Sequence, residues 1–254
     1  MLVNGRHEMV RRAIRSFEAQ TYPACRLILY DTSPADVRDL QDIVGIPLAD
    51  REDIEVFESS AIDHHGERKT IGHLRNRANA CDGSSDIILH WDSDDWSHPR
   101  RIEEQVALLQ QSGADCVGYR EMLFWDTRPG QFCGAYLYSH PLKTYCIGTS
   151  LCYWRRVWEQ KPFPDLPNPK GGHGGTGEDD AWHKQVTCAA VKSCEYNREA
   201  TITGDTLADE RQPRMIASIH GSNTMHHERN LAANSPQWKR APGWDIYCRE
   251  KMQL

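Results

Sequence analysis

The first half of the chain alternates short apolar runs with stretches in which apolar side chains recur every three to four residues. The helical spacing covers residues 7–20 and 99–111 and predicts two amphipathic helices. The apolar runs at residues 26–30, 54–57 and 87–89 predict strands. A strand–helix–strand unit of this length implies a parallel pair of strands with a right-handed crossover. We therefore expect an α/β fold in this half.

The pattern changes after Gly113. Strand-like runs follow one another closely, at residues 116–119, 121–125, 132–138 and 145–154. Such spacing predicts antiparallel hairpins. A helix is predicted over residues 178–188 and a strand over residues 215–219. Because no segment between the halves has the composition of a linker, we expect one domain over residues 1–254, with halves 1–112 and 113–254.

Composition narrows the functional classes. The 254 residues are 39% apolar and 26% charged, which is typical of a globular protein. A net charge of -6 argues against a general nucleic-acid coat. No apolar run approaches the ~18–20 residues of a membrane span, and no charged-then-apolar leader is present. We therefore expect a cytoplasmic protein without a transmembrane segment.

The chain has nine cysteines, and none of them forms a C-x-x-C pair. The sequence therefore gives little support for a structural zinc site. Cys116, Cys146 and Cys152 lie inside apolar runs. Since a free cysteine behaves as a small apolar residue in a core, we expect reduced, buried thiols rather than disulfides.

Three carboxylates, Asp92, Asp94 and Asp95, directly follow the predicted strand 87–89. In an open α/β sheet, ligands bind at the carboxyl ends of the strands. Asp92 and Asp94 are two residues apart, so on an extended chain both point to the same side. A hard divalent cation shared with a diphosphate would offset their repulsion. The alternative is a solvated acidic turn that caps the helix after Pro99.

A second acidic group, Glu178-Asp179-Asp180, opens the predicted helix 178–188. It follows residues 161–177, a segment rich in proline and glycine that predicts a loop. The loop is either a mobile element beside a site or an ordinary surface loop. Carboxylates in a first helical turn are also favoured by the helix dipole, so capping is the alternative interpretation of this group.

Five short motifs occur in the order typical of one enzyme family. They are Asn4-Gly5-Arg6 with Ser16-Phe17 and Gln20-Thr21-Tyr22-Pro23, then Tyr30-Asp31-Thr32-Ser33, Gly72 with Arg75-Asn76, Asp92-Ser93-Asp94-Asp95, and Gly177-Glu178-Asp179-Asp180. Over roughly residues 1–190 the chain resembles the inverting glycosyltransferases of the GT-A type, family 2. The family's first strand is nearly absent, because only Met1–Val3 precede the first turn.

The resemblance implies a fold and a division of the chain. The fold is a GT-A (Rossmann-like) α/β arrangement, a mixed, mainly parallel sheet flanked by helices, with a smaller antiparallel subregion on the acceptor side. Residues 1–112 would bind the nucleotide-sugar and residues 113–254 would form the acceptor side.

The resemblance also implies roles for individual residues in metal-dependent transfer from a nucleotide-sugar donor, for which a UDP-sugar is expected. Asp94 and Asp92 would hold Mn²⁺ or Mg²⁺. Asp179 would be the general base, with Glu178 as the neighbouring candidate. The residues implied in donor binding are Asn4, Arg6, Asp31, Gly72, Arg75 and Asp92. The segment His220-Gly221-Ser222-Asn223-Thr224 is similar to one in some relatives, which makes His220 a candidate metal ligand; a structural, backbone-bonded histidine is the alternative.

Two other functions fit parts of the pattern. A sugar-phosphate nucleotidyltransferase uses a similar acidic strand end, but no glycine- and lysine-rich phosphate loop follows the first strand. A non-catalytic nucleotide- or carbohydrate-binding module would keep the fold, but both acidic groups are intact. For a transferase, the acceptor stays open among a glycan, a lipid-linked glycan, a protein, a small molecule and a modified DNA base.

Overall fold

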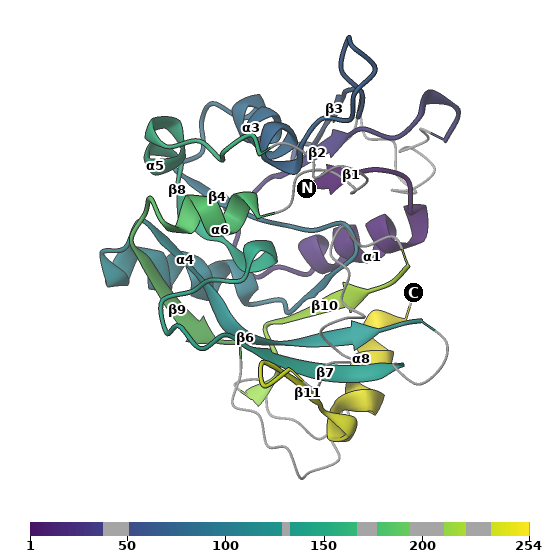
Figure 1. Ribbon diagram of the computed structural model, residues 1–254, viewed down its shortest axis with the longest axis vertical. Helices are drawn as coiled ribbons and strands as arrows, with labels where there is room; N and C mark the ends of the chain where they lie inside the picture. Colours follow the sequence, from purple (N-terminus) through teal and green to yellow (C-terminus); the bar gives the residue numbers. More distant parts are fainter. Residues whose placement is uncertain (38–50, 129–132, 167–176, 194–210, 222–234, 254) are drawn as a thin grey trace.

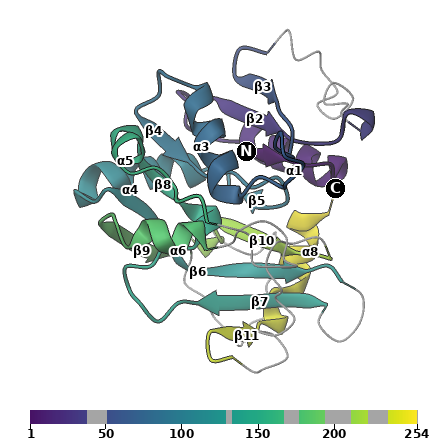
Figure 2. The ribbon, with the colours of Figure 1, turned by 45° about the horizontal axis from the view of Figure 1, so that its top comes forward.

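The strands of this protein form two sheets, and helices pack around them (Figures 1 and 2). The computed structural model describes residues 1–37, 51–128, 133–166, 177–193, 211–221 and 235–253. The helices are α1 (His7–Glu18), α3 (Ile71–Cys81), α4 (Arg101–Ser112), α5 (Arg155–Gln160), α6 (Glu178–His183) and α8 (Asp245–Met252). The strands are β1 (Leu2–Val3), β2 (Leu27–Asp31), β3 (Ile54–Glu58), β4 (Ile87–Leu89), β5 (Trp96–Ser97), β6 (Cys116–Asp126), β7 (Gly134–Ser139), β8 (Cys152–Trp154), β9 (Cys188–Lys192), β10 (Met215–Ile219) and β11 (Trp238–Arg240).

The smaller sheet is parallel, in the order β1-β2-β3. Helix α1 connects β1 to β2, as the periodicity of residues 7–20 predicts. Its apolar face buries Val10, Ile14 and Phe17 in one core cluster with Leu29 of β2 and Trp91. The helix therefore covers the sheet with the stripe that the sequence shows, and its burial holds β1 and β2 in register.

The larger sheet has eight strands and is built around β6. Strand β6 pairs antiparallel with β7 and β8, and parallel with β9 and β10. Strand β10 lies between β5 and β6, although it comes from the last fifth of the chain. Every residue of β10 is buried, as expected for a strand with neighbours on both sides.

The proportions of the two sheets correct the expected fold class. We expected a mainly parallel sheet with a smaller antiparallel subregion, whereas among the described strands the parallel sheet is the smaller one. The parallel sheet stays small because β4 does not join it. Strand β1 has only two residues and pairs with β2. Strand β4 pairs antiparallel with β8 instead, so β4 belongs to the larger sheet.

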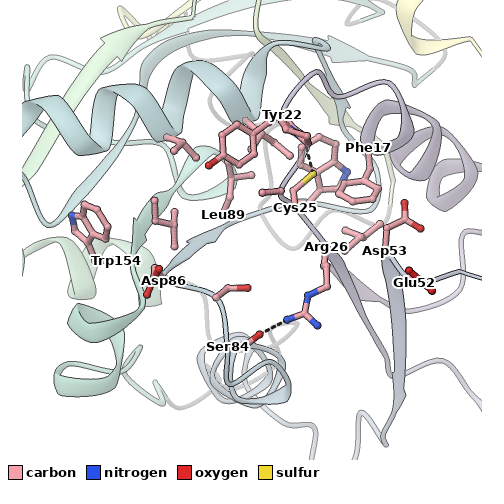
Figure 3. Close-up of a pocket in the computed structure, with 18 of the residues that line it drawn as sticks. Phe17, Tyr22, Cys25, Arg26, Glu52, Asp53, Ser84, Asp86, Leu89 and Trp154 are labelled. Carbon is pink, nitrogen blue, oxygen red and sulfur yellow. Dashed lines mark hydrogen bonds between the residues drawn. The ribbon is translucent and has the colours of Figure 1, made fainter.

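A cavity of about 740 Å³ lies between the starts of β2 and β4 (Figure 3). Its walls include Arg26 and Leu27 of β2, Ile87 and Leu89 of β4, and Phe17 of α1. The carboxylates that follow β4 are not among its lining residues. The cavity therefore marks the place where the two sheets separate, and it is distinct from the acidic turn.

Two predicted elements are shorter than expected. The helix predicted over 178–188 ends at His183, because Cys188 begins β9 and pairs with Cys116 of β6. Of the strand predicted over 145–154, only Cys152–Trp154 form β8, and the short 3₁₀ helix η3 (Gly148–Ser150) precedes it. All eight cysteines that the structure describes are free. Within the described parts of the chain, no helix is both long and apolar enough to cross a membrane.

Candidate functional site

The acidic turn lies between β4 and β5 and brings its three carboxylates together. One oxygen each of Asp92, Asp94 and Asp95 lies within 4.8 Å of the other two. Asp94 and Asp95 are buried, and Asp92 is partly exposed. Three like charges at this separation repel one another strongly away from bulk water. The turn therefore needs protons, basic side chains or a cation to be stable.

Two basic side chains from opposite ends of the chain contact Asp94. His220, directly after β10, places Nε2 2.7 Å from Asp94 Oδ2. The Arg6 guanidinium donates to the same oxygen at 3.2 Å and to Ser93 Oγ at 3.2 Å. Burial would raise the pKa of Asp94, but the hydrogen bond from His220 and the charge of Arg6 outweigh it, so the pKa lies below its usual value. Asp94 is therefore an anion held between two cationic or donor groups.

The backbone of Arg6, whose side chain makes this contact, has a strained conformation. Its φ of 58° and ψ of 46° are left-handed, and it is the one non-glycine residue with positive φ among the described residues. Such a conformation costs roughly 1–2 kcal/mol for a residue with a side chain. Strained residues of this kind cluster at ligand sites. Arg6 directly precedes α1, and its left-handed backbone lets its guanidinium reach Asp94 and Ser93 in the acidic turn.

Asp95 is fixed by neutral donors. The Thr149 hydroxyl donates to Oδ2 at 2.5 Å and the Ser218 amide donates to Oδ1 at 2.9 Å. Burial and the charges of Asp94 and Asp92 raise the pKa of Asp95 well above its usual value. A bound cation would remove that penalty. The donor set, carboxylate oxygens with the imidazole of His220, fits a hard divalent ion such as Mn²⁺ or Mg²⁺.

The second acidic group divides into three environments at the start of α6. Glu178 is buried, and its Oε1 lies 3.1 Å from Nε of Arg75 in α3. Burial raises the pKa of Glu178, although Arg75 opposes the shift. Asp180 accepts a hydrogen bond of 2.6 Å from the Tyr145 hydroxyl. Asp179 lies between them in sequence and faces a different neighbour, η3.

Helix η3 contacts both acidic groups. At one end Gly148 lies against Asp179, so closely that a Cβ on Gly148 would be 2.0 Å from Asp179 Oδ2. Thr149, the next residue, holds Asp95. The Asp179 carboxylate and the acidic turn therefore both contact η3, through the consecutive residues Gly148 and Thr149.

Two further predicted site residues, Asn4 and Asp31, lie at the ends of β1 and β2. Asp31 ends β2 and is buried; its Oδ1 accepts from the amide and the hydroxyl of Ser33. Ser33 Oγ in turn accepts from the Gly5 amide at 2.7 Å. The turns after β1, which includes Asn4, and after β2 are thus tied together. Both stand at the carboxyl edge of the parallel sheet.

Gly72 has a packing role in this structure. A Cβ on Gly72 would lie 2.2 Å from the carbonyl oxygen of Pro164, so the absence of a side chain lets the segment before α6 pack directly on α3. Its expected part in donor binding stays a prediction. Of the two segments expected near the site, residues 167–176 and 222–224 lie outside the described residues.

Sequence reasoning missed several buried polar residues that support the site. Arg101 is fully buried and donates to the carbonyls of His90 at 2.8 Å and Thr149 at 3.1 Å. Arg12 donates to the carbonyls of Asp94 and Met252. The two arginines stand in amphipathic helices, where an arginine is usually solvated. The sequence offers one local signal of these supports: His90, whose carbonyl accepts from Arg101, is a polar residue between the apolar run 87–89 and Asp92.

The sequence matches no family model and no curated protein. Solved structures with a similar fold include that of S. aureus TarS 1–349 in complex with UDP-GlcNAc, with a TM-score of 0.57 and 11% identity over 88% of this chain and 58% of that chain. The mannosyltransferase PcManGT from Pyrobaculum calidifontis, in complex with GDP-Man and Mn²⁺, has a TM-score of 0.55 and 14% identity over 98% of this chain and 67% of that one. This chain thus spans less than two thirds of the TarS chain. The chain has a fold that glycosyltransferases of known structure share.

Proposed function

We propose that this protein is a metal-dependent, inverting glycosyltransferase that moves a sugar from a nucleotide-sugar, a UDP-sugar, to an acceptor hydroxyl. The observation that carries the proposal is the meeting of two acidic groups at η3, one of them a cluster of three carboxylates beside Arg6 and His220. The structural neighbours support it, since their structures hold UDP-GlcNAc, or GDP-Man with Mn²⁺.

In this proposal each acidic group has its own task. Asp92, Asp94 and His220 hold the divalent ion, which when bound offsets the charge that develops on the departing diphosphate. Arg6 contributes a second positive charge at the same place. Asp31, Asn4 and Arg75 line the donor side, within residues 1–112.

The transfer itself is assigned to Asp179. Its carboxylate accepts the proton of the acceptor hydroxyl as the hydroxyl oxygen attacks the anomeric carbon from the face opposite the diphosphate. One displacement inverts that centre, so no covalent glycosyl-enzyme forms. Glu178, paired with Arg75, positions the start of α6 rather than taking the proton. Residues 113–254 contribute η3 and α6 and would face the acceptor.

Thermal unfolding in the presence of a nucleotide panel tests the proposal. A ligand that binds only the folded state raises the free energy of unfolding, by about 2.7 kcal/mol at a ligand concentration of 100 times its Kd, and the melting temperature rises with it. We expect UDP to raise the melting temperature only when Mn²⁺ is present, and Asp94→Asn to remove that effect. Asp86→Asn, an exposed carboxylate at the other end of β4, is the matched control and should respond as the wild type does.

The outcomes separate the candidate functions. A Mn²⁺-dependent response to another nucleoside diphosphate would change the donor and keep the enzyme class. A response to nucleoside triphosphates with sugar phosphates would favour a nucleotidyltransferase. No response to any nucleotide, with or without Mn²⁺, would contradict the proposal.

A further inference from the structure

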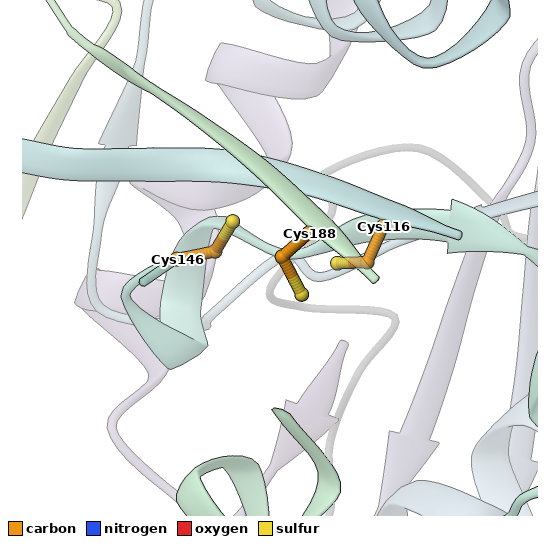
Figure 4. A group of neighbouring side chains, drawn as sticks. All are labelled: Cys116, Cys146 and Cys188. Atoms are coloured by element: carbon orange, nitrogen blue, oxygen red, sulfur yellow. The ribbon is translucent and has the colours of Figure 1, made fainter. Parts of the chain in front are cut away.

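Three cysteine thiols from three separate segments meet at the far end of α6. Cys116 begins β6 and Cys188 begins β9, and the two are partners in the parallel pairing of these strands. Cys146 lies just before η3. Each of the three sulfurs lies within 4.8 Å of the other two (Figure 4). Convergence of three thiols from distant positions sets this group apart from Cys152, a buried thiol of the same sheet that is not part of it.

The backbone makes room for this convergence at Gly118. A Cβ on Gly118 would lie 2.7 Å from Cβ of Cys146 and 2.9 Å from Ser150 Oγ. Since real Cβ atoms do not approach so closely, a larger residue on β6 would push Cys146 away from Cys116 and Cys188. The glycine therefore allows the thiol of the η3 segment to lie directly over the strand.

A histidine joins the group. His183 ends α6, and its Nδ1 lies 3.0 Å from Cys188 Sγ. Its Nε2 lies 2.7 Å from the backbone carbonyl oxygen of Cys146. With the proton on Nε2 donating to this carbonyl, the lone pair of Nδ1 would face Cys188 Sγ. Histidines that bind metals are oriented in the same way, with the other ring nitrogen donating to a carbonyl or carboxylate.

The surroundings are apolar. Cys116 and Cys146 are fully buried and pack in one cluster with Leu151, Tyr153 and Trp182. Thiolates in such a place need a cation beside them.

We propose that Cys116, Cys146, Cys188 and His183 hold a structural Zn²⁺ ion. Zinc takes four sulfur and nitrogen ligands in a tetrahedron, with Zn–S of about 2.3 Å, which places the sulfurs about 3.8 Å apart. Each sulfur here lies within 4.8 Å of the other two, so side-chain rotation alone would bring them to that separation. His183 contacts one of them, Cys188, at 3.0 Å, and a shift of its ring toward the other two sulfurs would make it the fourth donor. The site is separate from the acidic turn and uses different chemistry, soft thiolates rather than carboxylates.

The ion would fasten α6 to the larger sheet. His183 stands at the end of the helix that begins with Glu178, and the three cysteines belong to β6, β9 and the η3 segment. The site cannot be recognised from the sequence, because only His183 and Cys188 are close to each other along the chain. The other two ligands lie far upstream. Zinc at this place would hold α6, which begins with the second acidic group, and the η3 segment, which contacts Asp179.

Metal analysis of the purified full chain tests the proposal. Expressed with zinc in the medium and purified without a metal-affinity step, the wild type should contain about one zinc ion per chain. Cys188→Ser should lose it. Cys152→Ser, which replaces a buried thiol outside the group, should keep it. Mn²⁺ and nucleotides are absent throughout, so the result does not depend on the proposed transferase activity.

Cobalt substitution keeps the test decisive if the variants fail to fold. Adding Co²⁺ to the zinc-depleted wild type should produce thiolate-to-cobalt charge-transfer absorption and the strong visible bands of a tetrahedral ion. His183→Ala should shift the visible bands and retain the charge-transfer absorption. A wild type that holds no zinc, gives no such bands with Co²⁺, and titrates all three thiols as free cysteines would overturn the proposal, and so would a disulfide between any two of them.

Discussion

Gly148 determines where the Asp179 carboxylate lies. A methyl group at residue 148 would collide with the end of that side chain, which can rotate, rather than with rigid backbone. We expect Gly148→Ala to displace the Asp179 carboxylate and lower the transfer rate at least about tenfold, while UDP with Mn²⁺ still raises the melting temperature. Steady-state kinetics and thermal unfolding measure the two effects.

Gly83→Ala is the matched control, because a Cβ there meets nothing within 4 Å. It should leave transfer and donor binding at wild-type values. If Gly148→Ala kept the wild-type rate, Asp179 would not need its observed position, and its assignment as the base would lose its structural support.

Asp179→Asn tests the base directly. The change keeps the size of the side chain and removes its ability to take a proton, so we expect transfer to fall by about 10²–10⁴-fold with donor binding unchanged. Asp180→Asn, at the neighbour that accepts from Tyr145, should reduce transfer far less. The reverse ranking of these two variants would assign the proton transfer to Asp180 instead.

At the scale of residues, sequence reasoning could predict charged groups at strand ends but not their partners. The three carboxylates after β4 meet as predicted, and His220 does reach Asp94. Arg101 and Thr149 could not be predicted as their supports, because a buried arginine on α4 and a hydroxyl on η3 gain their meaning only when distant segments pack together.

Among the elements, the junction of α3 and β4 is fastened by one carboxylate. Asp82 follows α3, accepts from Ser84 and Ser85, and pairs with Arg26 at 2.7 Å and Arg155 at 3.5 Å. Burial would raise the pKa of Asp82, but the hydrogen bonds from Ser85 and Ser84 and the charge of Arg26 outweigh it and hold the pKa far below its usual value.

A pH dependence of stability follows from Asp82. Because its pKa is lower in the folded chain than in the unfolded one, its contribution is complete above the unfolded value of about 3.9 and is lost as the pH falls toward the folded value. We expect the melting temperature of the wild type to drop on acidification below about pH 4 more steeply than that of Asp82→Asn. Asp86→Asn should follow the wild-type curve; equal slopes for all three proteins would contradict the account.

Elements were predictable where local pattern decides, and the sheets were not. Helices α1 and α4 and strands β2, β3 and β10 lie where periodicity and apolar runs place them. The assignment of strands to sheets depends on pairings between segments far apart in sequence. The pairing of β4 with β8 is an example, since nothing in an apolar run of three residues states its partner.

At the scale of the whole molecule, His220 joins the end of β10 to the acidic turn. If it binds the ion or orients Asp94, His220→Gln should weaken Mn²⁺-dependent nucleotide binding by about 10–100-fold. Titrating Mn²⁺ at fixed UDP measures the change. His73→Gln, at a half-exposed histidine of α3, is the control. An unchanged Mn²⁺ requirement in His220→Gln would make the contact with Asp94 purely structural.

The place of β10 between β5 and β6 also sets an order of events during synthesis. Its partners Ser97 and Leu123 leave the ribosome long before Met215 and Ile216 do. Local helices fold early, whereas pairings across such distances close late. A nascent chain will therefore expose every carboxylate of the site well before it holds the strand that organises them. In the proposed function, nucleotide binding would then begin only after residue 220 has emerged.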